Sequence, residues 1–360
     1  MSNPHQPPPK GRGASTNPAG RFESAEYAYE PDMVDMPADI EDVEPSPRTQ
    51  FLIDASESLI NYNDSPDISF RASLNAYRGC EHGCSYCYAR PFHEYLGMSS
   101  GLDFETKIMV KTKAPVLLRK ELSKKGWTPQ VISMSGVTDC YQPAERKFQL
   151  TRRCLEVLLE YRNPVAIVTK NALITRDIDL LKQLAAFNCV GVFVSVTTLD
   201  PELAGKLEPR ASRPQARLET IRKLSEAGVP VGVMMAPVIP GLNESEIPAL
   251  LKAVAEAGAQ YANYVLLRLP YKVKDIFAEW LEIHYPLRKE KILGDIRSTR
   301  DGELYDSDYG SRMDGKGVRA SQIAQLFEVS LKRAGIRGGG PHLTTDHYRR
   351  LAANGQQELF

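Results

Sequence analysis

The sequence predicts an α/β fold, a partial (β/α)6 barrel of the TIM type built from parallel strands. Short apolar or β-branched runs alternate with amphipathic helical segments every 25 to 40 residues from about residue 72 to residue 268. This alternation is typical of right-handed βαβ crossovers, whose parallel strands are buried on both faces. About six such units fit a partial barrel, and an open doubly wound sheet is the alternative. In both folds, functional residues gather at the carboxyl ends of the strands.

The individual elements follow from these patterns. Uninterrupted apolar runs predict strands at residues 72–78, 131–137, 165–170, 190–196, 229–236 and 264–267. Helical periodicity predicts helices at residues 148–161, 177–187, 214–228 and 243–258. The first of these helices places Leu150, Cys154 and Leu158 on one face. Two of the others end at Gly228 and Gly258, because glycine readily takes the left-handed conformation that ends a helix.

The two ends of the chain differ from this core. Residues 1–50 contain nine of the 25 prolines and nine acidic residues against four basic ones, with no apolar periodicity. They predict a disordered, proline-rich acidic tail, because such a segment buries too little apolar surface to offset its ordering entropy. Residues 51–270 are the predicted catalytic core. Residues 271–360 are a predicted accessory segment packed on the barrel, with one helix at 320–335.

The overall composition excludes several classes of protein. The 360 residues include 45 basic and 45 acidic side chains, and zero net charge argues against a strongly basic nucleic-acid coat protein. The longest apolar stretch, residues 229–241, is too short to span a bilayer, and the first residues lack the apolar core of a secretory signal. Six cysteines are too few for a disulfide scaffold. We therefore expect a cytoplasmic protein without a membrane partner.

The strongest functional signal is a cysteine-rich segment directly after the first predicted strand. It reads AYRGCEHGCSYCYARPF and places Cys80, Cys84 and Cys87 at C-x3-C-x2-C spacing. Three thiolates this close can ligate one soft centre, either iron–sulfur or zinc. A structural zinc site takes four protein ligands, and the sequence offers only His82, inside the same loop. A four-iron cluster on three thiolates keeps one iron open, as a catalytic centre requires.

This motif, with an aromatic residue (Tyr86) before the last cysteine, resembles that of the radical S-adenosylmethionine (SAM) superfamily. The resemblance implies that Cys80, Cys84 and Cys87 hold a [4Fe–4S] cluster whose open iron binds the amine and carboxylate of SAM. It further implies one-electron cleavage of SAM to methionine and a 5′-deoxyadenosyl radical that takes a hydrogen atom from the substrate. The electron would come from a reductant of the flavodoxin or ferredoxin type.

Two further segments extend the resemblance toward SAM binding. VISMSGVTD (131–139) lies where the family binds the SAM amine, which implies a contact through Thr138 or Asp139. The usual glycine-glycine-acid triplet is absent there. PVIPGLNE (237–244) is similar to the family segment G-x-I-x-G-x-x-E, which implies that Ile239 contacts the adenine.

Within the superfamily, the chain resembles the spore photoproduct lyase–like branch. The segments that carry this likeness are CSYCYAR (84–90), VTK (168–170), VSVTTLD (194–200) and LEPR (207–210). The likeness implies that Lys170 pairs with the SAM carboxylate and that Ser195 and Thr197 hydrogen-bond its ribose or carboxylate. The lyase uses a cysteine as hydrogen-atom donor, which makes Cys140 the candidate catalytic donor here. A buried thiol without a chemical role is the alternative.

The branch also implies a class of substrate. A lyase that acts on DNA must grip phosphates, and Arg210, Arg213, Arg217 and the basic residues of 297–319 are candidates for this role, unless they pair with nearby acids. We therefore expect a radical SAM enzyme in DNA lesion repair or nucleic-acid modification, with DNA or RNA as partner. The alternatives are a radical SAM enzyme acting on a protein, peptide or small metabolite, and a zinc-stabilised binding module.

Overall fold

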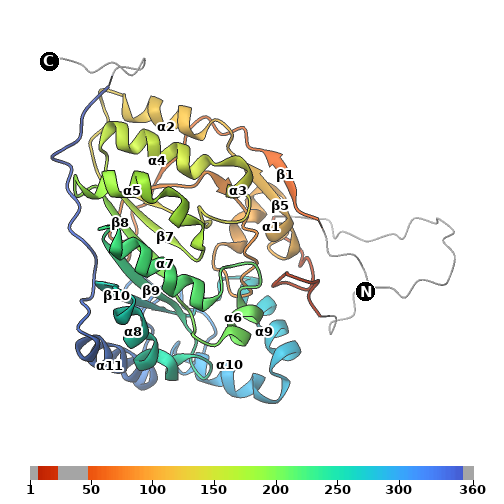
Figure 1. Ribbon diagram of the computed structural model, residues 1–360. Helices are drawn as coiled ribbons and strands as arrows, with labels where there is room; N and C mark the ends of the chain where they lie inside the picture. The colour runs from red at the N-terminus through yellow and green to blue at the C-terminus, as the bar shows by residue number, and fades with distance from the viewer. Residues whose placement is uncertain (1–6, 23–47, 352–360) are drawn as a thin grey trace, which may run out of the picture.

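A seven-stranded sheet forms the centre of the molecule in the computed structural model, which describes residues 7–22 and 48–351 (Figure 1). The strand order is β10-β9-β8-β7-β6-β3-β2. The strands are β2 (Ile60–Tyr62), β3 (Ala72–Leu74), β6 (Ile132–Met134), β7 (Val165–Thr169), β8 (Val190–Ser195), β9 (Val231–Val238) and β10 (Tyr261–Leu266). All neighbours from β3 to β10 are parallel, and only β2 is antiparallel. Six parallel strands whose first and last members do not pair confirm the predicted partial barrel.

Helices connect the parallel strands and cover the outer face of the sheet (Figure 1). They include α3 (Glu145–Phe148), α4 (Leu150–Tyr161), η2 (Ala172–Asp177), α5 (Ile178–Ala185), α6 (Pro201–Leu207), α7 (Pro214–Glu226), η3 (Glu244–Glu246) and α8 (Ile247–Glu256). Val192 and Val194 of β8 and Val231 and Val233 of β9 are completely buried between the layers. Burying such a side chain contributes about 1.5–3 kcal/mol, so the continuous apolar runs that predicted these strands also hold them together.

A second, three-stranded sheet that the sequence pattern did not predict lies beside the first parallel strand. It consists of β1 (Gln50–Ile53), β5 (Lys107–Val110) and β4 (Tyr77–Arg78) in that order, and the strand predicted at residues 72–78 is divided between the two sheets as β3 and β4. The nearby helices are η1 (Arg90–Leu96), α1 (Leu102–Thr106) and α2 (Ala114–Leu122). Strands of two to four residues are too short to show periodicity. The pairing of β4 with β5 fixes the chain immediately before the cysteine-rich segment.

The C-terminal part of the chain packs on the barrel as expected, but with more helices than the one predicted. It contains α9 (Val273–His284), η4 (Pro286–Arg288), α10 (Lys289–Arg297) and α11 (Gly317–Ala334). Val273, Phe277 and Trp280 of α9 join a buried apolar cluster that also contains Cys84 and Tyr86. After α11 the chain runs extended along one side of the barrel, where Thr344 N–H donates to Asn188 O (Figure 1). The division of the chain at residues 50 and 270 stays a prediction.

Part of the expected N-terminal tail is ordered, which corrects our prediction for residues 7–22, here called the N-terminal strap. Arg12 and Ala14 are buried, and Arg12 Nη1 donates to the Glu105 carbonyl at 2.9 Å. The composition argument counted only apolar residues, whereas glycines and buried hydrogen bonds hold this segment. Residues 1–6 and 23–47 of the predicted tail lie outside the described residues.

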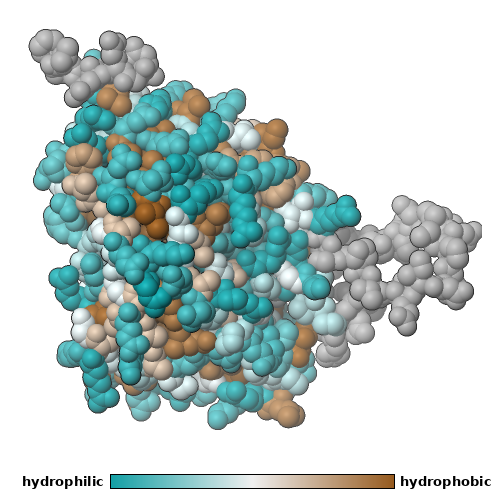
Figure 2. Space-filling model, viewed as in Figure 1, coloured by the Kyte–Doolittle hydropathy of each residue, from teal (hydrophilic) through white to brown (hydrophobic). Residues whose placement is uncertain are grey.

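The surface of the molecule is mixed in character. The face seen in Figure 2 is mainly hydrophilic, with scattered hydrophobic residues. Among residues 7–22 and 48–351, no helix combines the length and the apolar character that crossing a membrane requires.

Candidate active site

The three clustered cysteines lie in one loop, residues 79–90, which we call the cysteine loop. It follows β4 at the carboxyl end of the barrel, where the sequence argument placed the site. Cys80 and Cys84 are buried, Cys87 is half-buried, and all three are free thiols. Cys80 N–H donates to Phe104 O at 2.9 Å and Ser85 N–H donates to Leu207 O at 3.1 Å, so the loop is held by α1 on one side and α6 on the other.

The chemistry of these thiols fits a soft, electron-rich centre. Burial raises the pKa of Cys80, Cys84 and Cys87, and the neighbouring Cys84 and Cys87 raise the pKa of Cys80 further. The three thiols are therefore neutral by themselves, and a bound cationic centre would stabilise their thiolate forms. Three soft donors within one buried loop match the ligand set of an iron–sulfur cluster.

The side chains, the three cysteines included, are not arranged around a single metal ion in the described residues. In the described part of the chain, no group of three or more His, Cys, Asp or Glu side chains is placed to hold one ion. His82, the only further ligand that the sequence offered for zinc, is engaged elsewhere. Its Nδ1 lies 3.4 Å from Asp139 Oδ2 and its Nε2 lies 3.0 Å from Asn171 Nδ2.

A buried ion pair outside the cysteine motif fixes the backbone of the cysteine loop. Arg90 and Glu105 form it, and both side chains are fully buried. Arg90 donates to the Cys84 carbonyl from Nε at 3.0 Å and from Nη2 at 2.8 Å. The Glu105 carboxylate also accepts the N–H groups of Gly13 and Ala14, each at 3.0 Å. The N-terminal strap, the ion pair and a predicted cluster ligand thus form one connected unit.

A second buried carboxylate gathers three of the residues that the sequence selected for SAM. Glu208 accepts a hydrogen bond from the Tyr86 hydroxyl and another from Thr197 Oγ1 at 2.6 Å. Lys170 Nζ lies 3.3 Å from Glu208 Oε1, and it also donates to Ala236 O at 2.9 Å. The structure therefore brings Tyr86, Lys170 and Thr197 together at the carboxyl ends of β7, β8 and β9.

Arg217 completes this network from α7. It forms a buried ion pair with Glu208 and donates from Nη1 to the Ser195 carbonyl at 2.9 Å. Burial alone would raise the pKa of Glu208, but Arg217 and then Lys170 hold it well below its usual range. Burial and the Glu208 charge raise the pKa of Tyr86 well above its usual value. Glu208 is thus a permanent carboxylate and Tyr86 a permanent hydrogen-bond donor.

Sequence reasoning missed Glu208, Arg217, Glu105 and Arg90 as residues that organise the site. The available signals were the LEPR segment, which contains Glu208, and the CSYCYAR segment, which ends at Arg90, since both carry the resemblance to the lyase-like branch. Arg217 was a candidate for gripping phosphates, and this prediction is wrong because its guanidinium is buried against Glu208.

The other candidates for a phosphate grip are also engaged within the protein. Arg210 pairs with Glu81 at 3.0 Å, and Arg213 donates to Pro201 O at 2.8 Å. In the 297–319 stretch the internally bonded residues are Arg300, Arg312, Lys316 and Arg319. Arg210, Arg312, Lys316 and Arg319 pair with acids, as the alternative expected, whereas Arg213 and Arg300 donate to backbone carbonyls.

Of the remaining cofactor candidates around the same end of the barrel, Thr138, Ser195 and Ile239 are buried and Asp139 is slightly exposed. Asp139 accepts hydrogen bonds from Thr169 Oγ1 and Lys170 N, both at 2.7 Å, so it joins β7 to the segment after β6. Thr138 Oγ1 donates to the Tyr77 carbonyl at 3.0 Å. Ser195 is buried at the end of β8. Ile239 is completely buried in the apolar cluster that contains Cys84 and Tyr86.

Cys140, the candidate hydrogen donor, lies within the main apolar core. It is 3% exposed, and its backbone is held by Ser135 Oγ and Thr151 Oγ1. Burial raises the pKa of its thiol well above the usual value. The position of Cys140 therefore favours the alternative given above, a buried thiol without a chemical role.

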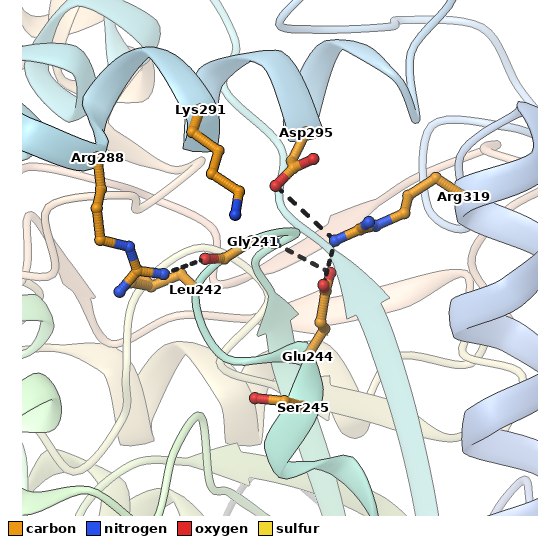
Figure 3. A pocket seen from close by; sticks show the side chains of 8 residues that line it. All are labelled: Gly241, Leu242, Glu244, Ser245, Arg288, Lys291, Asp295 and Arg319. Atoms are coloured by element: carbon orange, nitrogen blue, oxygen red, sulfur yellow. Dashed lines mark hydrogen bonds and ion pairs between the residues drawn. The ribbon is translucent and has the colours of Figure 1, made fainter.

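The turn after β9 has a polar pocket on its outer side (Figure 3). The pocket has a volume of about 240 Å³ and lies between this turn, α10 and α11. Arg288 Nη2 donates to the Gly241 carbonyl at 2.7 Å, while Arg319 pairs with Glu244. These contacts hold the outer side of the turn, whose inner residue is the buried Ile239.

Several known proteins are similar to this chain in sequence. Over 221 residues the chain is 38% identical to an uncharacterized protein of Mycobacterium tuberculosis; the match covers 61% of this chain and 65% of that one, less than two thirds of its length. It is 25% identical over 219 residues to the radical SAM Nalpha-GlyT isomerase of Pseudomonas phage M6, covering 60% of this chain and 43% of that one.

Solved structures show the same fold. Spore photoproduct lyase complexed with dinucleoside spore photoproduct matches with a TM-score of 0.58 at 16% identity, over 80% of this chain and 81% of that one. A variant of that lyase with bound AdoMet and dinucleoside spore photoproduct also has a TM-score of 0.58, at 15% identity and with 82% of each chain covered. The family model of the Radical SAM superfamily matches residues 74–254, which include the cysteine loop and the Glu208 network. The chain therefore belongs to the radical SAM superfamily.

Proposed function

We propose that the chain binds a [4Fe–4S] cluster through Cys80, Cys84 and Cys87, cleaves SAM reductively, and uses the resulting radical to take a hydrogen atom from a nucleic-acid base. The observation that carries this proposal is the set of three thiols in one loop, two buried and one half-buried, directly beside the Glu208 network. When bound, the cluster supplies one electron to SAM, which yields methionine and a 5′-deoxyadenosyl radical.

The protein's own residues contribute position, charge and exclusion of water. Glu208 holds the Lys170 ammonium and the Tyr86 hydroxyl in place, so both are oriented before any ligand arrives. Lys170 is 15% exposed and can turn one of its N–H groups toward the SAM carboxylate. The apolar cluster around Ile239 offers a dry surface to the adenine and keeps water from a reactive intermediate.

The names of two similar proteins support a nucleic-acid substrate. Spore photoproduct lyase was solved with a dinucleoside lesion, and the phage relative is named as a GlyT isomerase. A protein, peptide or small metabolite is the alternative substrate. We further propose that a flavodoxin- or ferredoxin-type protein supplies the electron in the cytoplasm.

Substitution of one cysteine tests the cluster and the SAM chemistry together. The wild-type protein, reconstituted anaerobically with iron and sulfide, reduced and given SAM, should release 5′-deoxyadenosine that mass spectrometry can quantify. Cys84→Ala should lose both the iron complement and this product, because two thiolates cannot hold the cluster.

Cys189→Ala is the matched control, since it removes a buried thiol far along the chain from the cysteine loop. It should keep iron and product. A full four-iron complement in Cys84→Ala would contradict the ligand assignment, and about one zinc per wild-type chain without product would favour the zinc-stabilised module.

Substitution of Cys140 separates a hydrogen-donor role from cofactor binding. Cys140→Ala should leave the iron content and the substrate-free release of 5′-deoxyadenosine unchanged, because its thiol is packed in the main core and not in the cysteine loop. The measurement is the same anaerobic assay, with iron analysis alongside. A loss of product in step with a loss of iron would show that Cys140 supports the cofactor site.

A further inference from the structure

The barrel is open on one side, between its first parallel strand β3 and its last, β10. Side chains from distant parts of the sequence meet across this opening. Arg312 pairs with Asp67 at 2.5 Å, which links the C-terminal segment to the β2–β3 connection. At the same opening, the guanidinium of Arg268, two residues after β10, lies 5.3 Å from the ring centroid of Tyr88. Tyr88 directly follows Cys87, so Arg268 stands at the entrance beside the cysteine loop.

Whereas Arg312 pairs with Asp67 and Arg300 donates to backbone carbonyls, Arg268 has neither an acidic partner nor a carbonyl partner within the described residues. Its one recorded hydrogen bond runs to the sulfur of Met313 at 3.6 Å, and a thioether is a weak acceptor. Its Nε is buried without any hydrogen-bond partner. A guanidinium that is partly withdrawn from water normally binds a carboxylate, a carbonyl group or a phosphate, since an unmade bond to a buried charged donor costs stability.

A second arginine, Arg300, lies close enough to Arg268 for the two charges to interact. Arg300 is buried, and its Nη atoms donate to the carbonyls of Leu267 and Arg312 at 2.8 and 2.9 Å. Burial lowers the pKa of Arg300, Asp306 opposes this shift, and the positive charge of Arg268 lowers the pKa further. The Nη atoms of Arg300 are bound to carbonyls, although its Nε, like that of Arg268, is buried without a hydrogen-bond partner. Among the described residues, the Nη donors of Arg268 reach only the Met313 sulfur and can still bind an incoming anion.

We propose that Arg268 binds a phosphate of a single-stranded or extruded nucleotide substrate at the opening of the barrel, with the Tyr88 ring supporting its guanidinium. The inference rests on the proposed nucleic-acid function and assigns to it a specificity-determining residue. The planar guanidinium matches two phosphate oxygens, which a lysine does less well. Aromatic rings interleaved with arginines are also the surface on which single strands bind.

The test is binding of a fluorescein-labelled single-stranded thymine-rich DNA oligonucleotide, followed by anisotropy at several salt concentrations. Arg268→Gln should weaken binding about tenfold, the low end of what hydrogen bonds to a charged group contribute. It should also reduce the salt dependence by about 0.7 in the slope of log affinity against log salt, the value for one phosphate contact on a single strand. Arg268→Lys should restore part of the slope but less of the affinity.

Two controls keep the result specific. Arg213→Gln removes an equal charge from the N-terminal end of α7, where the guanidinium donates only to a backbone carbonyl, and it should bind DNA like the wild type. SAM affinity and iron content should be unchanged in Arg268→Gln, since the proposed anion belongs to the substrate.

The possible outcomes distinguish the role of Arg268 from the proposed nucleic-acid function. Equal DNA affinity in the wild type and Arg268→Gln would overturn the role of Arg268 and leave the nucleic-acid function standing. Loss of SAM affinity with DNA binding intact would also overturn it, because the anion would then be the SAM carboxylate. A wild-type protein that binds no DNA or RNA oligonucleotide would overturn the nucleic-acid substrate itself, and the Arg268 assignment with it.

Discussion

Replacing Glu208 by alanine should destabilise the protein by about 3–5 kcal/mol, because removal of one partner leaves a buried ion pair uncompensated. The guanidinium of Arg217 would stay in the interior without its carboxylate, and Lys170, Tyr86 and Thr197 would lose their shared acceptor. Urea unfolding followed by circular dichroism under anaerobic conditions measures the stability change. SAM affinity should fall in the folded fraction, since Lys170 and Tyr86 are no longer held in place.

Two further variants show whether the charge of Glu208 is responsible. Glu208→Gln keeps the shape and the oxygen acceptor, so its stability should lie between that of the wild type and that of Glu208→Ala. Glu202→Gln removes an exposed carboxylate that pairs with Lys206 one helical turn away, and such surface pairs contribute about 0.5 kcal/mol. Equal unfolding midpoints in Glu208→Ala and Glu202→Gln would refute the central role assigned to Glu208.

Replacing Gly13 by alanine should detach the N-terminal strap from the cysteine loop. A Cβ at this position would lie 1.7 Å from the Gly83 carbonyl oxygen, a backbone atom that cannot move aside cheaply. Displacement would remove the two N–H groups that Gly13 and Ala14 donate to Glu105. We expect a loss of about 3 kcal/mol in unfolding free energy, because hydrogen bonds to charged groups contribute about 1.5 kcal/mol or more each.

The strap substitution should also affect the cluster. Glu105 holds Arg90, and Arg90 holds the Cys84 carbonyl, so a disturbed carboxylate loosens a predicted cluster ligand. Iron release and bleaching of the reconstituted protein in air should be faster than in the wild type. Gly126→Ala is the matched control, because its Cβ would meet no atom within 4 Å. If Gly13→Ala bleaches no faster than Gly126→Ala, the strap does not support the cysteine loop.

The parallel core could be predicted from the sequence because its signals are local. Runs such as those around Val192 and Val231 are buried on both faces, so burial leaves a continuous apolar pattern in the sequence. The cysteine loop is equally local, since three ligands of one centre lie within eight residues. The short strands β1 and β5 left no such pattern, and the tertiary contacts of the second sheet define them. The pattern at residues 72–78 could not show that β4 pairs in a different sheet from β3.

The charged network of the site was decided by tertiary structure. Glu105 meets Gly13 across 92 residues, and Tyr86 meets Glu208 across 122, so no periodicity or spacing could pair them. A buried charge is indistinguishable from a surface charge in the sequence until its partner is known, which is why Arg217 was mistaken for a phosphate ligand. The sequence by itself determined the barrel, the cysteine loop and the superfamily resemblance. Only the fold decided which charges stabilise the loop and that Arg268 lacks an acidic partner in the described part of the chain, because ion pairing depends on distance in space.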